Sequence, residues 1–237
     1  MSHTLNDLGQ PVGLPILDAL PRPFPERRRL TGRFGALEAL REDHADALFE
    51  AFSENADHAN WTYLPEEPWA SVEQARASCR AKAASRDPLF WVILDAEGRA
   101  VGHLSLLRIT PEVGSVEVGF VHYGPALQRH PLATEIQYLM MREVFDGLGY
   151  RRYEWKCDAL NAPSCRAAER LGFVYEGTFR QATVYKGRNR DTAWYATLDR
   201  DWPRLRDGFE RWLAPDNFDA TGQQKQRLEA LRAAPEG

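Results

Sequence analysis

A short polar segment in front of a long helical pattern has the composition of an anion-binding loop. The residues Gln128-Arg-His-Pro-Leu-Ala133 directly precede apolar residues that recur at helical spacing up to Leu148. A helix N-terminus presents unpaired backbone N–H groups and a partial positive charge, so this loop would suit a pyrophosphate group. The alternative is an ordinary well-capped helix, and the loop alone does not decide between the two.

The elements that must position this loop can be predicted from periodicity. Apolar alternation predicts a strand over Ser115–Val121, and helical spacing predicts a helix over Leu132–Leu148. A half-buried strand is predicted over Tyr153–Asp158, followed by a short helix that Asn161 opens. A strand, an anion-sized loop, a long helix, a strand and a short helix therefore succeed one another between residues 115 and 172.

The remaining patterns predict one α/β domain with an extension at each end. Residues 1–32 are rich in proline and end in a basic run, so an extended arm without regular structure is expected there. The domain is expected to span residues 33–202, and residues 203–237 are expected to form a C-terminal helix and tail that pack on the domain or trail from it. Further strands are predicted at 33–40, 90–95, 100–108, 179–185 and 192–198, and further helices at 41–52, 71–85 and 205–213.

Composition and charge exclude several classes of function. The chain of 237 residues has 43% hydrophobic and 27% charged residues, which is typical of a globular domain. Its formal net charge of -4 lacks the basic excess that a nucleic-acid partner requires, despite the run Arg27–Arg29. The three cysteines show no paired spacing and the six histidines show no ligand spacing, so neither a disulfide framework nor a metal site is expected.

The same chain shows no targeting pattern. No charged segment followed by an apolar stretch begins it, and no run approaches the ~18 apolar residues that a membrane-spanning helix requires. Unpaired cysteines fit a reducing compartment. We therefore expect a cytoplasmic protein without a membrane partner.

Five motifs follow one another along the chain. They are Glu117-Val-Gly-Phe120, Gln128-x-x-Pro-x-Ala133-Thr134-Glu135, Leu148-Gly-Tyr-Arg-Arg152, Asn161-x-x-Ser164 and Arg170-Leu-Gly-Phe173-x-x-Glu176-Gly177. In this order and spacing, residues 33–202 resemble the GCN5-related N-acetyltransferase (GNAT) family, in particular the group that acetylates ribosomal-protein N-termini. The resemblance implies the GNAT fold, an α/β fold with a mixed, mostly antiparallel sheet of about six or seven strands flanked by helices.

The resemblance also implies where the co-substrate acetyl-CoA binds. The parallel strands 115–121 and 153–158 would splay apart to admit the pantetheine arm, and backbone groups of Phe120 and Val121 would bond to its amides. Asn161 would cap its helix and also bond to this arm. The family's pyrophosphate loop carries over to Gln128, Arg129, His130, Leu132, Ala133 and Thr134.

Direct transfer to an amine needs a route for the proton of the incoming ammonium and a donor to the departing thiolate. Glu117 lies between Val116 and Val118 at the start of the splay, where its carboxylate could take that proton directly or through water. The alternative is an exposed strand glutamate. Ser164 matches the serine that resembles the family's thiolate proton donor, at a helix start that stabilises negative charge. Its alternative role is helix capping.

Two further segments are candidates for the acceptor side. The aromatic loop Trp61-Thr-Tyr63 with Trp69 is core or lid material, and the resemblance implies that this region walls the acceptor site. A basic cluster could meet an anionic group on a substrate, or it could be a solvated hairpin tip balanced by Asp191. The cluster comprises Arg180, Lys186, Arg188 and Arg190.

The implied reaction is transfer of an acetyl group from acetyl-CoA to a primary amine, on a small molecule or a protein N-terminus, in a ternary complex. The alternative is a non-catalytic acyl-CoA-binding sensor or scaffold that retains the fold. It is motivated by Pro131, which replaces the middle glycine of the loop, and by Thr183, where some ribosomal-protein acetylases have a glutamate. Trp194, Trp202 and Trp212 could supply the face of a homodimer.

Overall fold

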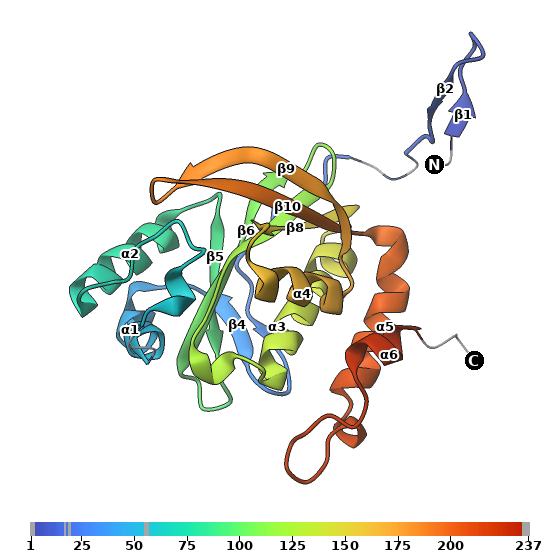
Figure 1. The fold of residues 1–237 in the computed structure, drawn as a ribbon. Helices are drawn as coiled ribbons and strands as arrows, with labels where there is room; N and C mark the ends of the chain where they lie inside the picture. Colours follow the sequence, from blue (N-terminus) through green and yellow to red (C-terminus); the bar gives the residue numbers. More distant parts are fainter. Residues whose placement is uncertain (1–2, 17, 19, 55–56, 234–237) are drawn as a thin grey trace.

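The computed structural model describes residues 3–16, 18, 20–54 and 57–233. Its central sheet is built from β3 (Leu30–Thr31), β4 (Ala36–Ala39), β5 (Leu89–Leu94), β6 (Ala100–Thr110), β7 (Ser115–Tyr123), β8 (Arg152–Asp158), β9 (Val174–Tyr185) and β10 (Arg188–Leu198). The strands lie in the order β3-β4-β5-β6-β7-β8-β10-β9, and only β7 and β8 run parallel to each other. The expected mixed, mostly antiparallel sheet is confirmed (Figure 1).

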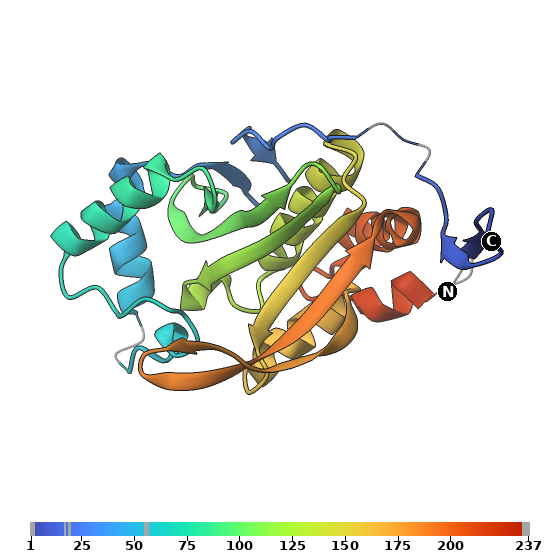
Figure 2. The same cartoon turned by 90° about the horizontal axis from the view of Figure 1, so that it is seen from above.

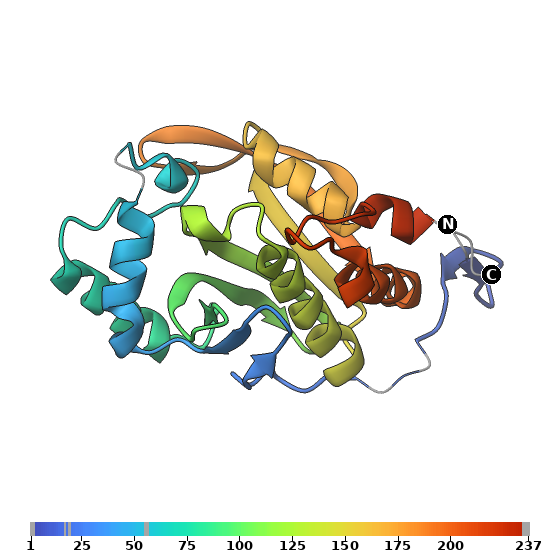
Figure 3. The same cartoon turned by 90° about the horizontal axis from the view of Figure 1, so that it is seen from below.

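Helices cover both faces of this sheet (Figure 1 and Figure 3). One face carries α1 (Ala45–Ser53) and α2 (Val72–Ala84), and the other carries α3 (Pro131–Arg142), α4 (Ala162–Leu171), α5 (Trp202–Leu213) and α6 (Leu228–Ala233). The side chain of Ser71 accepts a hydrogen bond from the backbone N–H of Gln74 and caps α2, as the spacing of Ser71 and Gln74 predicts. Among the described helices, none is both long enough and apolar enough to cross a membrane.

All six residues of β5 are buried because alternate side chains enter two different cores. Trp91 and Ile93 belong to the core that α3 covers, whereas Phe90, Val92 and Leu94 belong to the core under α1 and α2. A strand covered on both faces has a continuous apolar sequence instead of an alternating one. The run Leu89–Leu94 is therefore the centre of a three-layer arrangement.

The N-terminal arm is more regular than its proline content predicts. The expectation of no regular structure is wrong for β1 (His3–Leu5) and β2 (Pro11–Gly13), which pair as a hairpin, and for β3, which pairs with β4. The side-chain oxygen of Asn6 accepts hydrogen bonds from the N–H groups of Leu8 and Gln10 at 3.0 and 2.9 Å, and this closes the hairpin turn. Because β3 joins the sheet, the sheet has eight strands instead of the expected six or seven. Residues 1–2, 17, 19 and 234–237 of the predicted arm and tail lie outside the described residues.

The tryptophans of the C-terminal helix belong to the core. Trp202 and Trp212 are each 3% exposed, and their indole N–H groups donate to Asp146 and Gln224, both at 2.7 Å. The expectation that these two residues supply a dimer face is therefore wrong, because α5 turns its apolar side toward α3. Trp194, on β10, is half-buried.

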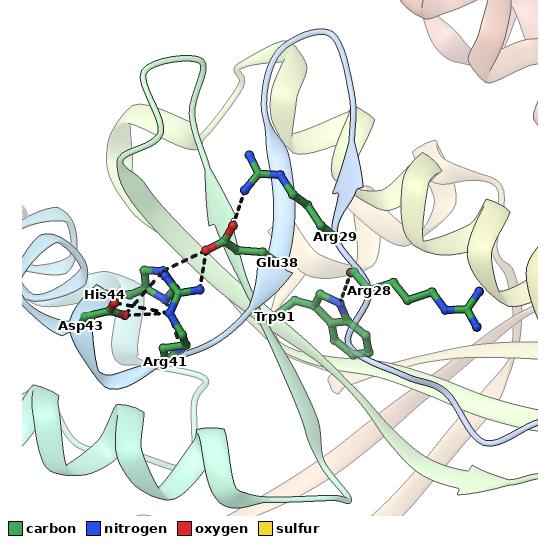
Figure 4. A network of polar contacts seen from close by, with 7 residues as sticks. All are labelled: Arg28, Arg29, Glu38, Arg41, Asp43, His44 and Trp91. Carbon is green, nitrogen blue, oxygen red and sulfur yellow. Dashed lines mark hydrogen bonds and ion pairs between the residues drawn. The ribbon is translucent and has the colours of Figure 1, made fainter.

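The basic run of the arm makes contacts within the protein. The indole N–H of Trp91 donates to the carbonyl of Arg28 at 3.2 Å, and Arg29 pairs with Glu38 of β4 (Figure 4). Glu38 also pairs with Arg41 at 2.8 Å. Burial alone would raise the pKa of Glu38, but the interactions with Arg41 and Arg29 outweigh burial and lower it. These contacts fix the last residues of the arm beside β4 and β5.

A buried glutamate joins the β3–β4 turn to the first turns of α3. The carboxylate of Glu135 accepts hydrogen bonds from the backbone N–H groups of Arg33 and Phe34 at 2.6 and 2.8 Å. A Cβ atom on Gly32 would lie 2.2 Å from Cδ of Glu135, so a larger residue there would push the carboxylate away from these hydrogen bonds. The start of α3, where the anion-binding loop ends, is therefore held by a turn about 100 residues away in sequence.

We expect Glu135→Ala to lower the free energy of unfolding by about 2–4 kcal/mol, because two part-buried N–H groups lose their shared acceptor. Urea unfolding followed by tryptophan fluorescence measures this loss. Glu97→Ala is the control: that glutamate lies in the β5–β6 turn with a side chain 67% exposed. The control variant should stay within about 0.5 kcal/mol of the parent. Equal losses in the two variants would contradict the role given to Glu135.

Candidate active site

The parallel strands β7 and β8 are hydrogen-bonded along only part of their length. Their pairing begins at Ser115 and Arg152 and ends at Val118 and Trp155. Beyond this point β7 continues to Tyr123 and β8 to Asp158, and Figure 2 shows the two strands diverging toward these ends. The splay that the family resemblance implies is thus present, and it leaves two unpaired strand edges facing each other.

A bulge in β7 lies just beyond the last pair. Ser105 of β6 is the partner of Gly119 and His103 is the partner of His122, so β7 has one residue more than β6 between these pairs. Phe120 takes a positive φ of 48° at this bulge. A bulge removes backbone groups from the ladder. The backbone groups of Phe120 and Val121, predicted to bind pantetheine, therefore lie where the regular ladder is interrupted.

The predicted phosphate loop forms a solvent-facing entry to α3. Gln128, Arg129 and His130 are exposed, and Arg129 takes a positive φ of 62°. His130 is the N-cap residue, because its Nδ1 atom accepts a hydrogen bond from the N–H of Leu132 at 3.2 Å. Pro131 is the first residue of the helix, where a missing N–H leaves no helical hydrogen bond unmade. The proline therefore does not disturb the start of α3, where the N–H groups of Leu132 and Ala133 are bonded to His130.

The other predicted loop residues point into the protein. Leu132 is buried in the main core, and Ala133 packs at its edge. The hydroxyl of Thr134 accepts a hydrogen bond from Arg170 of α4 at 2.9 Å. Arg170 in turn lies over the ring of Trp212, 5.2 Å from its centroid. Thr134 thus ties α3 to α4 through its side chain.

Glu117 is buried between two cations. Its carboxylate is 4% exposed, so it is not the exposed strand glutamate of the alternative interpretation. Oε2 pairs with Arg108 of β6 and, at 2.9 Å, with Nζ of Lys156 on β8. Oε1 lies 3.6 Å from the place that a Cβ atom on Gly119 would take, and no hydrogen bond from the described residues reaches it. The free carboxylate oxygen therefore faces the residue that follows the last β7–β8 pair.

Lys156, the β8 cation beside Glu117, belongs to a chain of ion pairs along β8. Nζ of Lys156 lies 2.7 Å from Glu154, whose other oxygen pairs with Arg152 at 2.5 Å. Burial alone would raise the pKa of Glu154, but the interactions with Lys156 and Arg152 outweigh burial and lower it. These partners are not among the residues expected at the site. The alternation of charged with apolar residues along 153–158 placed Glu154 and Lys156 on one face of the strand, and it could have identified them.

Asn161 and Ser164 form the start of α4, opposite Glu117 across the diverging strands. The side chain of Asn161 accepts a hydrogen bond from the N–H of Ser164 at 3.1 Å, so Asn161, and not Ser164, caps the helix. The hydroxyl oxygen of Ser164 accepts a hydrogen bond from the indole N–H of Trp155 at 3.0 Å. Ser164 is therefore held at the level on β8 where strand pairing ends.

Two other polar groups nearby are unsuited to proton or acyl transfer. Burial raises the pKa of Cys157 to about 12, so this thiol stays protonated and cannot act as a nucleophile near neutral pH. Burial lowers the pKa of His122 to about 3, so its ring stays neutral. Within the part of the chain that the structure describes, no group of three or more His, Cys, Asp or Glu residues could hold a metal ion.

The segments predicted to surround the acceptor meet beside the splay. Nζ of Lys186, in the β9–β10 turn, donates to the carbonyl of Trp61 at 2.8 Å. The hydroxyl of Tyr63 donates to the carbonyl of Leu160, just before α4, at 3.1 Å. Trp61 itself is buried and packs with Trp69 at 5.2 Å between ring centroids. The loop between α1 and α2 is thus attached both to the hairpin tip and to the start of α4.

Comparison with known proteins matches this architecture to one family. Residues 36–174, more than half of the chain, match the family model described as an acetyltransferase (GNAT) domain. The crystal structure of a GCN5-related N-acetyltransferase from Brucella melitensis is 47% identical, covers 92% of this chain and 100% of its own, and superimposes with a TM-score of 0.90.

A curated relative gives the same result. The protein named "Uncharacterized N-acetyltransferase YnaD" of Bacillus subtilis is 26% identical over 140 residues, which are 59% of this chain and 81% of the relative. The splayed parallel pair, the bulge in β7 and the start of α3 all lie within the matched segment. From the family match and the 47% identity over nearly its whole length, the chain belongs to the GNAT acetyltransferase family and is an N-acetyltransferase.

Proposed function

We propose that this protein transfers an acetyl group from acetyl-CoA to a primary amine, of a small molecule or a protein N-terminus, by direct transfer in a ternary complex. One observation carries the proposal. The free Oε1 atom of Glu117 faces Gly119 on β7, and the hydroxyl of Ser164 lies against Trp155 on β8, at the two sides of the point where the strands separate. A proton acceptor and a proton donor thus flank the place where a thioester would enter.

The proposed donor site follows the diverging strands and the start of α3. Backbone groups of Phe120 and Val121 would hold the pantetheine amides, and the exposed loop with the N-terminus of α3 would hold the pyrophosphate. The loop residues of this proposal are Gln128, Arg129, His130, Leu132, Ala133 and Thr134, and Asn161 adds a contact to the arm. Pro131 leaves α3 intact, because the N–H that it lacks would have no partner within the first turn of the helix.

The proposed reaction balances at these residues. The amine nitrogen attacks the thioester carbonyl, its proton passes to Oε1 of Glu117 directly or through water, and the C–S bond breaks as the amide forms. Ser164 donates its proton to the departing thiolate and is reprotonated from solvent, to which Glu117 releases the proton that it took. The hydrogen bond from the indole N–H of Trp155 stabilises the negative charge that then develops on Oγ of Ser164.

The division of the chain is part of the same proposal. The family match at 36–174 lies inside the proposed acyltransferase domain of residues 33–202. The proposed arm of residues 1–32 meets β4 and β5 through its last residues, 28–31, and the proposed C-terminal segment of residues 203–237 includes most of α5, whose apolar side shares the main core. Unpaired cysteines support a cytoplasmic location.

We expect Glu117→Gln to lower kcat by about 10²-fold or more, because the amide cannot accept the proton. The measurement is coenzyme A release from acetyl-CoA with a panel of amines: a polyamine, an aminoglycoside, an amino acid and a peptide with a free N-terminal serine. Calorimetry should show unchanged acetyl-CoA binding in this variant.

Glu176→Gln is the matched control for this substitution. Glu176 pairs with Arg152 on the same strand system but does not contact Lys156 or Glu117. Its loss should change kcat by about threefold at most. Turnover with none of the amines would reject the proposed function, and undiminished turnover in Glu117→Gln would reject Glu117 as the proton acceptor.

We expect Ser164→Ala to lower kcat by about 10- to 100-fold and the free energy of unfolding by about 1 kcal/mol, because the indole N–H of Trp155 loses its acceptor. Asn161→Ala removes the helix cap and should cost about the same in urea unfolding. Comparing the two variants separates the chemical role of Ser164 from a structural one. A variant Ser164→Ala that is less stable but equally active would refute the assignment.

We also propose that two copies form a homodimer through β9, the edge strand of the sheet. Val174, Phe179 and Val184 of β9 are 54–72% exposed, and an unpaired apolar edge favours association. Two antiparallel β9 strands related by a twofold axis would extend the sheet with identical contacts from each copy. The strand carries both Glu176 and Arg180, so charge does not oppose this pairing.

Sedimentation across a concentration series should show a dimer, and the double substitution Val174→Lys and Val184→Lys should shift it to monomer. Like charges facing each other across the two edges destabilise the pairing. Val113→Lys is the control, since that valine is 52% exposed in the β6–β7 turn. A monomer in the parent protein, or an equal shift in the control, would refute the proposed interface.

A further inference from the structure

Two carboxylates of the site lie side by side on neighbouring strands. Glu117 of β7 and Glu154 of β8 are direct partners in the parallel ladder, so their side chains leave the same face of the sheet. Both are buried, at 4% and 9% exposure. Two desolvated carboxylates on directly paired residues repel each other, and without a counter-ion one of them takes up a proton.

Lys156 supplies the counter-ion for both. Its Nζ atom lies 2.9 Å from Oε2 of Glu117 and 2.7 Å from Oε2 of Glu154, and its side chain is 4% exposed. The ring of Trp194, its partner on β10, covers the ammonium at 3.7 Å. The two carboxylates and the aromatic ring enclose the ammonium group. Its position is therefore fixed, and solvent screens its charge only weakly.

The other charged groups around Glu117 act more weakly or less directly. From β6, Arg108 pairs with Oε2, but its side chain is 60% exposed and screened by solvent. From β8, Arg152 reaches Glu154 instead, and from β9, Glu176 reaches Arg152. Among the described residues of β10, the neutral ring of Trp194 contacts Lys156, which in turn pairs with Glu117. Lys156 is therefore the buried cation of this cluster.

We infer that Lys156 is a positioning residue that keeps Glu117 ionised and holds its Oε2 atom, so that Oε1 stays turned toward Gly119 at the splay. The effect of Lys156 on catalysis rests on the proposed function, in which Oε1 accepts the proton of the ammonium. The effect of Lys156 on the charge of Glu117 is independent of that function and can be measured on the protein alone.

The test is a pH titration of the full-length protein labelled with ¹³C at the glutamate carboxyl carbons, with the Glu117 signal assigned from Glu117→Gln. In Lys156→Met we expect the midpoint of the Glu117–Glu154 carboxyl pair to rise by about one pH unit or more, because the ionised forms lose their partner and face each other. Lys156→Arg keeps the charge and should keep the midpoint of the parent.

Two further variants guard against a folding defect. In Glu154→Gln the neighbouring charge is gone, so the midpoint of Glu117 should fall, and in the double variant Glu154→Gln and Lys156→Met it should return toward that of the parent. Lys82→Met is the control, because Lys82 is the other buried lysine among the described residues, paired with Glu66 at 2.8 Å near Trp69. This control should leave the Glu117 signal unchanged.

The outcomes separate this inference from the proposed function. Unchanged midpoints in both Lys156→Met and Glu154→Gln would overturn the role of Lys156, even if Glu117→Gln abolishes turnover. A shifted midpoint together with full activity of Glu117→Gln would support the role of Lys156 and overturn Glu117 as the proton acceptor. If both proposals hold, the acid limb of kcat/KM in Lys156→Met moves to higher pH and Lys156→Arg restores it. One acceptor amine is used throughout, so its own ionisation contributes equally to every variant.

Discussion

The interruption of hydrogen bonding between β7 and β8 is the constraint on which the rest of the site depends. Two parallel strands at the centre of a sheet normally pair to their ends, because unpaired buried backbone groups are costly. Here pairing stops at Val118 and Trp155. The bulge at Phe120 turns β7 away, and β8 stays in the sheet because β10 pairs with it up to Asp158. The unpaired edge of β8 is thus held in place by its regular pairing with β10 on the other side.

Each side of this opening is held by a different kind of interaction. On the face with Glu117, ion pairs across β6, β7 and β8 fix the carboxylate, while on the opposite face the starts of α3 and α4 approach the strands. Arg170 links the two helices through Thr134, and Glu135 links α3 to the β3–β4 turn. The polar groups of the site are consequently held by rigid elements, and the loop between α1 and α2 closes only its outer side.

Local sequence signals predicted the elements, and long-range contacts were beyond them. The periodicity of 132–148 and the caps Ser71 and Asn161 depend on neighbours within a few residues, so they could be read from the chain. The cluster around Lys156 depends on the register of β7 against β8, and the bulge at Phe120 depends on the register against β6. Neither register can be predicted from the sequence of one strand alone. The hairpin closed by Asn6 is the reverse case, a local signal hidden by the surrounding prolines.

Three residues without the freedom of glycine adopt positive φ angles at this site: Arg108, Phe120 and Arg129, at 48°, 48° and 62°. Each such conformation costs about 1 kcal/mol relative to a relaxed backbone. All three lie at the proposed active site, and backbone strain at such a site is typical of the trade-off between stability and activity. By linkage, any ligand that binds only the folded form of these segments also raises the melting temperature of the whole protein.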